Sequence, residues 1–166
     1  GTMWMKDPVF PVPSSLIEQA CTFNDYQCGQ VFNPGDGIVI RTGKLNHPNG
    51  ACGYRIEFAG KAISICTDTE HFDDGIDQSV VSLSQDADVM VYDSAYTDEE
   101  YSKFKGWGHS TWQEAIKVAE TANVKQTFLF HHDPSHDDAK MDAIAEEAAK
   151  VRSGVRPAIE GEEIEL

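Results

Sequence analysis

The fold class is decided by one stretch of sequence, Gly53-Tyr54-Arg55-Ile56-Glu57-Phe58-Ala59-Gly60-Lys61-Ala62-Ile63-Ser64-Ile65-Cys66-Thr67. In Gly53–Phe58 aliphatic or aromatic side chains alternate with charged ones, which is the pattern of a β-strand with one buried face. Ala59-Gly60 predicts a tight turn, and the mostly apolar Lys61–Thr67 predicts a strand that returns beside the first. The stretch therefore predicts a β-hairpin, and with it an antiparallel beginning to a sheet.

Strands and helices alternate after this hairpin. Short, wholly apolar runs such as Val89–Tyr92 are typical of strands in the middle of a sheet. Ser110-Thr111 supplies capping residues for one helix, and acidic residues begin the next helix, as the helix dipole favours. The further strands expected are Ile38–Thr42, Val89–Tyr92, Thr127–Phe130 and two weak ones, Arg156–Ile159 and Glu163–Leu166. The expected helices are Trp112–Ala122 and Asp137–Val151, the second with Ala139, Ile144, Ala148 and Val151 facing inward. This order predicts an α/β fold with a mixed sheet flanked by helices.

The first 35 residues differ from the rest of the chain. Three prolines (Pro8, Pro11 and Pro13) disfavour a helix at the start, so residues 1–35 are expected to form a proline-rich lead-in with one short helix, Ser14–Ala20. Asn33-Pro34-Gly35-Asp36-Gly37 predicts a turn before the first strand. A length of 166 residues fits one compact core, so we expect a single domain over residues 1–166.

The chain is strongly acidic, with 13 Lys and Arg, 28 Asp and Glu, and a formal net charge of −15. This charge repels polyanions, which argues against bulk nucleic acid and against an anionic membrane as partners. The sequence has no apolar run of the roughly 18 residues that a membrane helix needs, and no signal-peptide pattern. Four cysteines without a CxxC pair indicate free thiols in a reducing cytoplasm, with a Cys21–Cys28 disulfide as the alternative.

Histidines gather at the ends of the predicted elements. His47 follows the Ile38 strand, His131 ends the Thr127 strand, and His109 precedes a helix, while Asp68 ends the hairpin. Side chains at strand ends converge on one edge of an α/β sheet. Imidazole and carboxylate groups that converge suit a divalent metal such as zinc or manganese. A surface or hydrogen-bonded histidine is the alternative at each position, and spacing alone does not decide between them.

Four motifs resemble those of the metallo-β-lactamase-fold hydrolases. Their order is most similar to the branch that contains transfer-RNA 3′-processing ribonuclease Z and the phosphonate-pathway phosphodiesterases. The motifs are Leu45-Asn46-His47-Pro48-Asn49-Gly50-Ala51-Cys52-Gly53-Tyr54-Arg55-Ile56-Glu57, Thr67-Asp68-Thr69, Leu129-Phe130-His131, and Tyr92-Asp93-Ser94-Ala95-Tyr96-Thr97 followed by Gly108-His109-Ser110-Thr111. The resemblance runs from Asp36 to the C-terminus and implies half of an αββα sandwich.

The resemblance implies a role for each matched residue. His47 and His131 would each ligate one metal ion, zinc foremost and manganese as the alternative, and Asp68 would bridge the two ions. His109 would stand beside the leaving group as a proton donor. Asp93 would hold His109 in one tautomer, or would instead only cap a turn.

The residues around these motifs receive simpler interpretations. Glu70 and His71 are expected to belong to a polar loop, with a place behind the metal ligands as the alternative. His132 and His136 are expected behind the ligands or at the surface. Trp107 is expected to be a packing anchor, with a wall of a substrate cleft as the alternative.

The HxHxDH motif that supplies most metal ligands in this family is absent here. We therefore expect the chain to represent the C-terminal half of such a hydrolase, with an incomplete metal site and no activity in isolation. The implied function is a metal-dependent phosphodiesterase acting on a small phosphodiester. The alternatives are a non-catalytic binding or sensory module and a half-fold that associates with itself or with the missing half, since an open sheet favours a homo-oligomer.

Overall fold

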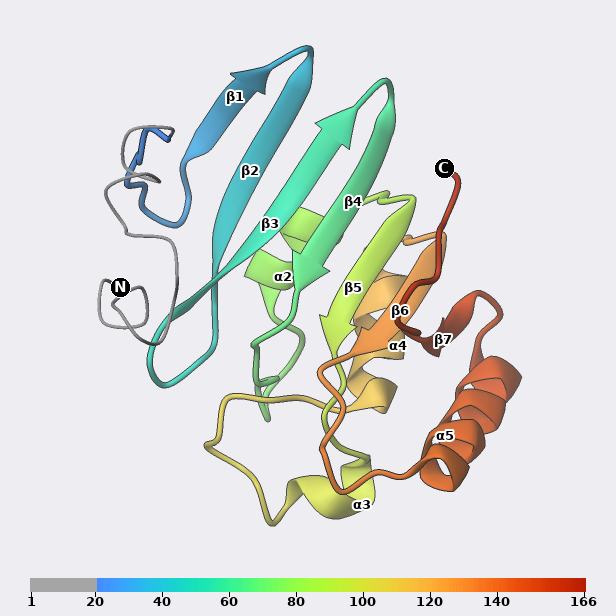
Figure 1. Ribbon diagram of the computed structural model, residues 1–166. Coiled ribbons are helices and arrows are strands. Elements are labelled where there is room, and N and C mark those ends of the chain that lie inside the picture. Colours follow the sequence, from blue (N-terminus) through green and yellow to red (C-terminus); the bar gives the residue numbers. More distant parts are fainter. Residues whose placement is uncertain (1–20) are drawn as a thin grey trace, which may run out of the picture.

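The computed structural model describes residues 21–166 and builds them around one seven-stranded sheet, whose strands lie in sequence order from β1 to β7 (Figure 1). Strands β1 to β4 are antiparallel, and strands β4 to β7 are parallel, so the predicted mixed α/β sheet is confirmed. The strands are β1 Val31–Gly35, β2 Ile38–Leu45, β3 Ala51–Phe58, β4 Lys61–Cys66, β5 Val89–Asp93, β6 Gln126–Phe130 and β7 Val155–Pro157. The helices are α2 Gln78–Ser84, α3 Asp98–Tyr101, α4 Trp112–Thr121 and α5 Asp138–Val151.

The predicted hairpin is formed by β3 and β4, which pair antiparallel with Tyr54 opposite Ile65 and Phe58 opposite Lys61. Its turn places Ala59 and Gly60 at φ of 49° and 78°. Two successive residues with positive φ are what a two-residue hairpin turn requires, because this turn follows the right-handed twist of the strands. The hairpin thus joins the antiparallel part of the sheet to the parallel part.

Both ends of the sheet differ from the prediction. Val31–Gly35 forms strand β1, where we expected a turn beginning at Asn33, and the turn itself is confined to Asp36-Gly37. Pro34 is tolerated because β1 is an edge strand, where a missing N–H donor costs little. The weak strand expected at residues 163–166 does not form. The helix expected at 14–20 lies outside the described residues.

Helices α2 and α4 cover one face of the sheet (Figure 1), and the core lies between them and the strands. Met90, Tyr92 and Leu129 point into this layer and are at most 1% exposed. Helix α4 buries its stripe of small residues fully, since Ala115 and Ala119 are both 0% exposed. Gly53 lets the layers approach closely, because a Cβ there would lie 2.9 Å from Leu83.

Helix α5 only partly follows the prediction. Ile144 and Ala148 are buried as expected, whereas Ala139 and Val151 are exposed. The helix lies beside β7 at the end of the sheet and meets α4 along a narrow strip, so the residues at its two ends remain in solvent (Figure 1).

The opposite face of the sheet carries no helix in the described part of the chain (Figure 1). Its apolar side chains follow one another across the strands in register, and each is only half-buried. They are Ile40, Ile56, Ile63, Ile65 and Val91.

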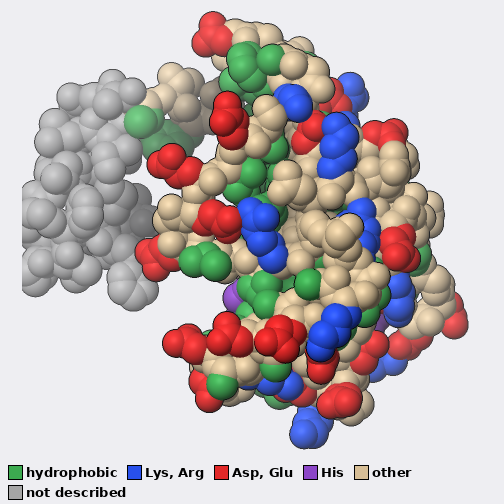
Figure 2. Space-filling view, turned by 90° about the vertical axis from the view of Figure 1, so that its right-hand side faces the viewer, with side chains coloured by type: hydrophobic (Ala, Val, Ile, Leu, Met, Phe, Trp, Pro, Cys, Tyr) green, Lys and Arg blue, Asp and Glu red, His purple; other side chains and the backbone are tan. Residues whose placement is uncertain are grey.

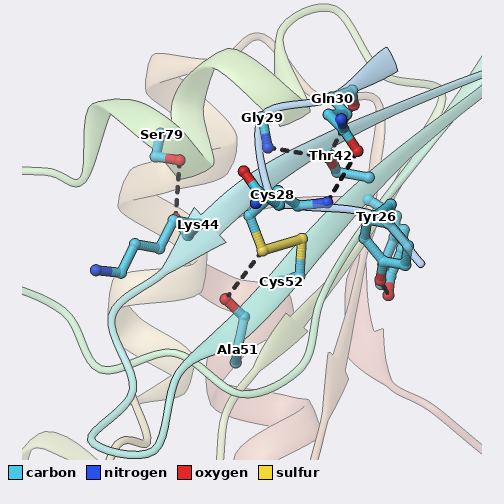
Figure 3. Close-up of a disulfide and its surroundings, with 11 residues drawn as sticks. Tyr26, Cys28, Gly29, Gln30, Thr42, Lys44, Ala51, Cys52 and Ser79 are labelled. Atoms are coloured by element: carbon cyan, nitrogen blue, oxygen red, sulfur yellow. Dashed lines mark hydrogen bonds between the residues drawn. A yellow bond between two sulfur atoms is a disulfide. The ribbon is translucent and has the colours of Figure 1, made fainter. Parts of the chain in front are cut away.

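The cysteines correct the expectation of four free thiols. Cys28 and Cys52 form a disulfide that ties the segment before β1 to strand β3 (Figure 3), so the alternative Cys21–Cys28 pairing is also wrong. Cys66 is free and fully buried, and burial raises the pKa of its thiol to about 12. The thiol argument for a reducing cytoplasm therefore does not hold for this chain.

Among the described residues, every helix is too short or too polar to cross a membrane.

Candidate metal and catalytic site

The candidate site lies at one edge of the sheet, where four strands running in the same direction end (lower edge in Figure 1). His47 lies two residues beyond β2, and Asp68 lies two residues beyond β4. Asp93 is the last residue of β5, and His131 directly follows β6. The topology therefore brings four side chains that are distant in the sequence to one edge, as the strand-end argument predicts.

Asp68, His109 and His131 form a cluster in which one ligand atom from each residue lies within 4.8 Å of the others. The Nδ1 atom of His131 is 3.8 Å from Oδ1 of Asp68, and the rings of His109 and His131 have centroids 4.4 Å apart. His131 has a positive φ of 64°, which is uncommon for a residue with a side chain. Such local backbone strain is often found at functional sites.

Asp93 is completely buried and orients His109. One of its carboxylate oxygens accepts a hydrogen bond from Nδ1 of His109 at 2.8 Å, and the other accepts one from the amide of Ser110 at 3.2 Å. Further bonds come from the amides of Thr69 and Ala95. A buried carboxylate needs such donors to offset its desolvation. The bond to Asp93 occupies Nδ1 of His109, so Nε2 is the nitrogen left free.

This arrangement favours the charged form of His109. The hydrogen bond to Asp93 raises the pKa of His109 and outweighs burial, which acts in the opposite direction. An imidazole with a raised pKa is better able to hold a proton near neutral pH.

His47 lies close to the cluster but outside it. Its ring centroid is 5.7 Å from that of His109, and its ring packs against the backbone of Gly108, where a Cβ would lie 2.3 Å from Cδ2 of His47. His47, Asp68 and His131 thus share the predicted edge, and the ring of His109 lies near the rings of both His47 and His131. The sequence suggested no metal-ligand position for His109, yet the structure brings this residue within ligand distance of Asp68 and His131.

Glu70 is the residue that the sequence interpretation misjudged most. It is 8% exposed, and its carboxylate accepts hydrogen bonds from Tyr101, Gly106 and Gly108, so it is not part of a solvated loop. Burial raises the pKa of Glu70, but these three hydrogen bonds outweigh it and lower the pKa overall. His71 is likewise held in place, with Nδ1 2.9 Å from the hydroxyl of Ser110 and its ring packed against that of Tyr101 at a centroid distance of 4.2 Å.

The remaining candidates lie outside the cluster. Trp107 is 63% exposed, and its ring packs edge-on against Phe104 at 5.5 Å, while Phe104 stacks on Tyr96 at 4.4 Å. His136 contacts Glu100 at 3.2 Å, and burial lowers the pKa of the neighbouring His132.

The cluster fits a divalent metal ion in its donor chemistry. Imidazole and carboxylate groups of this kind are ligands that zinc accepts. The donor types suit zinc better than magnesium or calcium, which prefer oxygen ligands alone.

Comparisons with known proteins agree with this geometry. Residues 11–132 match the family described as the beta-lactamase superfamily domain. The chain is similar to ribonuclease Z of Gemmatimonas aurantiaca (30% identity over 132 residues, 80% of this chain and 40% of the relative). It is also similar to ribonuclease Z of Lactobacillus acidophilus (28% identity, 88% of this chain and 52% of the relative). The chain thus spans about half the length of the curated relatives it matches.

Solved structures show the same fold. The metallo-β-lactamase fold protein YhfI from Bacillus subtilis aligns with a TM-score of 0.65 and 23% identity, over 80% of this chain and 51% of that one. The short form of human tRNase Z aligns with a TM-score of 0.54 and 25% identity, over 63% of this chain and 39% of that one. A diphosphatase from the PhnP family aligns with a TM-score of 0.59 and 17% identity, over 83% of this chain and 47% of that one.

Gly108→Ala should weaken zinc binding about tenfold or more, because its new Cβ would push His47 away from the site edge. The matched control is Gly106→Ala, which imposes the same positive-φ strain (89° against 94°) but meets no atom within 4 Å. Isothermal titration with zinc chloride measures both. Equal affinities in the two variants would show that the contact with His47 is irrelevant to the metal.

Asp93→Asn should lower the pKa of His109 in the metal-free chain, because the negative charge that favours the imidazolium is lost while burial remains. An NMR titration of the histidine ring signals measures the change. Asp73→Asn is the control, since this exposed carboxylate pairs with Lys105 and does not touch His109. An unchanged His109 pKa in Asp93→Asn would contradict the orienting role of Asp93.

Proposed function

The chain belongs to the beta-lactamase superfamily domain family, and on this basis we propose that it is part of a metal-dependent phosphodiesterase. The observation that supports this most strongly is the cluster of Asp68, His109 and His131, with a buried Asp93 behind it. We propose that Asp68 and His131 hold a divalent metal ion, zinc foremost, and that His47 serves a second ion which Asp68 bridges. A bound ion would polarise a phosphoryl oxygen and lower the pKa of a coordinated water.

His109 acts on the leaving-group side in this proposal. Its Nδ1 is bonded to Asp93, so Nε2 carries the proton that would pass to the departing oxygen. The raised pKa of His109 keeps that proton available near neutral pH. Asp93 contributes by fixing the ring orientation, so that the proton does not have to be positioned during the reaction.

A small phosphodiester fits the charge better than a long RNA does. The net charge is −15, and acidic side chains are spread over the face seen in Figure 2. Such a surface repels a polyanion at long range but affects a substrate with one phosphate much less. The ribonuclease Z relatives make RNA the competing substrate class, which would need a basic surface on another part of the protein.

His109→Ala tests the catalytic proposal in the full-length protein that contains this chain. We expect kcat for an alkyl phosphodiester to fall by about 10² to 10⁴-fold, the usual range for a lost general acid. The loss should be smaller for p-nitrophenyl esters, because p-nitrophenolate leaves without a proton. His136→Ala is the control, since this imidazole contacts Glu100 outside the cluster.

Two results would overturn this assignment. If His109→Ala removes bound zinc, measured by metal analysis, then His109 is a ligand rather than a proton donor. If it slows all substrates equally, then its role is structural.

A self-associating module is the second candidate function, and the half-buried apolar face of the sheet favours it. We expect the isolated chain to form a dimer through Ile63 and Ile56, which lie opposite each other in the register, and through the adjacent pair Ile65 and Val91. Light scattering should show a mass that rises with concentration and that Ile63→Lys abolishes. Val151→Lys, on the exposed side of α5, is the control. A monomer at every concentration would contradict this candidate.

A further inference from the structure

Glu70 connects three of the four segments that carry the candidate metal and proton-transfer groups, namely those of Asp68, His47 and His109. Its position, two residues after Asp68, places it beside the first segment. Its backbone forms two hydrogen bonds with Asn46, the residue before His47: the Glu70 amide donates to the Asn46 carbonyl at 2.8 Å, and the Asn46 side-chain amide donates to the Glu70 carbonyl at 2.9 Å. Its side chain points to the third segment, which ends at His109.

The third segment depends on the Glu70 carboxylate for its shape. Oε1 accepts hydrogen bonds from the hydroxyl of Tyr101 at 2.8 Å and from the amide of Gly106 at 2.7 Å, and Oε2 accepts one from the amide of Gly108 at 2.8 Å. Without this acceptor, the buried amide of Gly108 would lose its partner, and a buried donor without a partner is destabilising.

The bond to Gly108 has a direct consequence for the site. Gly108 touches the ring of His47 and immediately precedes His109 in the chain. Fixing the backbone of Gly108 therefore fixes one side of the His47 ring and the starting point of His109. The carboxylate of Glu70 reaches both histidines through this single residue.

We propose that Glu70 is a positioning residue that sets the distances of His47 and His109 from Asp68. This inference rests on the proposed function in one respect, namely that these groups bind a metal ion and act together. Glu70 itself does not touch the metal position, because its two oxygens are bonded to Tyr101, Gly106 and Gly108. A residue in this position changes metal affinity through the orientation of the ligands.

Glu70→Gln tests the inference, because the amide keeps the size of the side chain but replaces one acceptor oxygen with an NH₂ group. This NH₂ group cannot accept the hydrogen bond that a backbone N–H donates to the carboxylate. The control is Glu114→Gln, a glutamate of similar burial (5% exposed) whose carboxylate pairs with Lys117 on helix α4. We expect Glu70→Gln to weaken zinc binding by about 10 to 100-fold in calorimetric titration. In the zinc-free chain, the NMR signals of His47 and His109 should shift, and the amides of Gly106 and Gly108 should exchange faster. Glu114→Gln should change none of these.

The outcomes separate this inference from the proposed function. If the unaltered chain binds no zinc, the proposed metal site fails, while the histidine signals and amide exchange still decide the role of Glu70. If Glu70→Gln lowers thermal stability but leaves zinc affinity and both histidine signals as in Glu114→Gln, then Glu70 only stabilises a loop and the proposal is wrong. Should Glu70→Gln fail to fold, Tyr101→Phe removes one of the three donors. It should weaken zinc binding by less than about tenfold and shift the same signals, and unchanged signals would overturn the proposal.

Discussion

The site depends on a buried carboxylate at the end of strand β5. Asp93 has no contact with solvent, so its charge must be offset by hydrogen bonds from the protein. The donors come from two other segments, through Thr69 after β4 and through His109 and Ser110 before α4. Satisfying one buried charge therefore brings together the end of β4, the loop before α4 and the end of β5. The chemistry proposed for this edge follows from that convergence.

Glu70 provides a second point of convergence beside Asp93. The two carboxylates lie on either side of the loop that ends at His109, one binding its amides at Gly106 and Gly108 and the other binding its imidazole. One hydrogen bond leaves the imidazole ring of His109 able to rotate or tilt. That motion is restricted when the loop that carries the ring is also fixed on its other side. Such preorganisation is what allows a few side chains to act on one substrate.

Much of this arrangement could be predicted from the sequence, and the rest could not for identifiable reasons. The alternation in Gly53–Phe58 and the apolar run at Val89–Tyr92 predicted the hairpin and a central strand, because local patterns report which side chains are buried. Strand β1 was not predicted because it contains Asn33-Pro34-Gly35, and these residue types are typical of turns rather than of strands. Glu70 was misjudged because its three partners lie at least 31 residues away, and no local pattern records so distant a contact. The roles of His47, Asp68 and His131 remain predictions, although the structure places all three at one edge.

The proposed site requires a divalent metal ion held by Asp68 and His131, with His109 beside it as a proton donor. Crystals of the chain grown with zinc, measured at the zinc absorption edge, test it most directly. We expect an anomalous peak about 2.0–2.2 Å from a carboxylate oxygen of Asp68 and from a ring nitrogen of His131. A peak elsewhere in the molecule, or none at millimolar zinc, would rule out a metal site at Asp68 and His131.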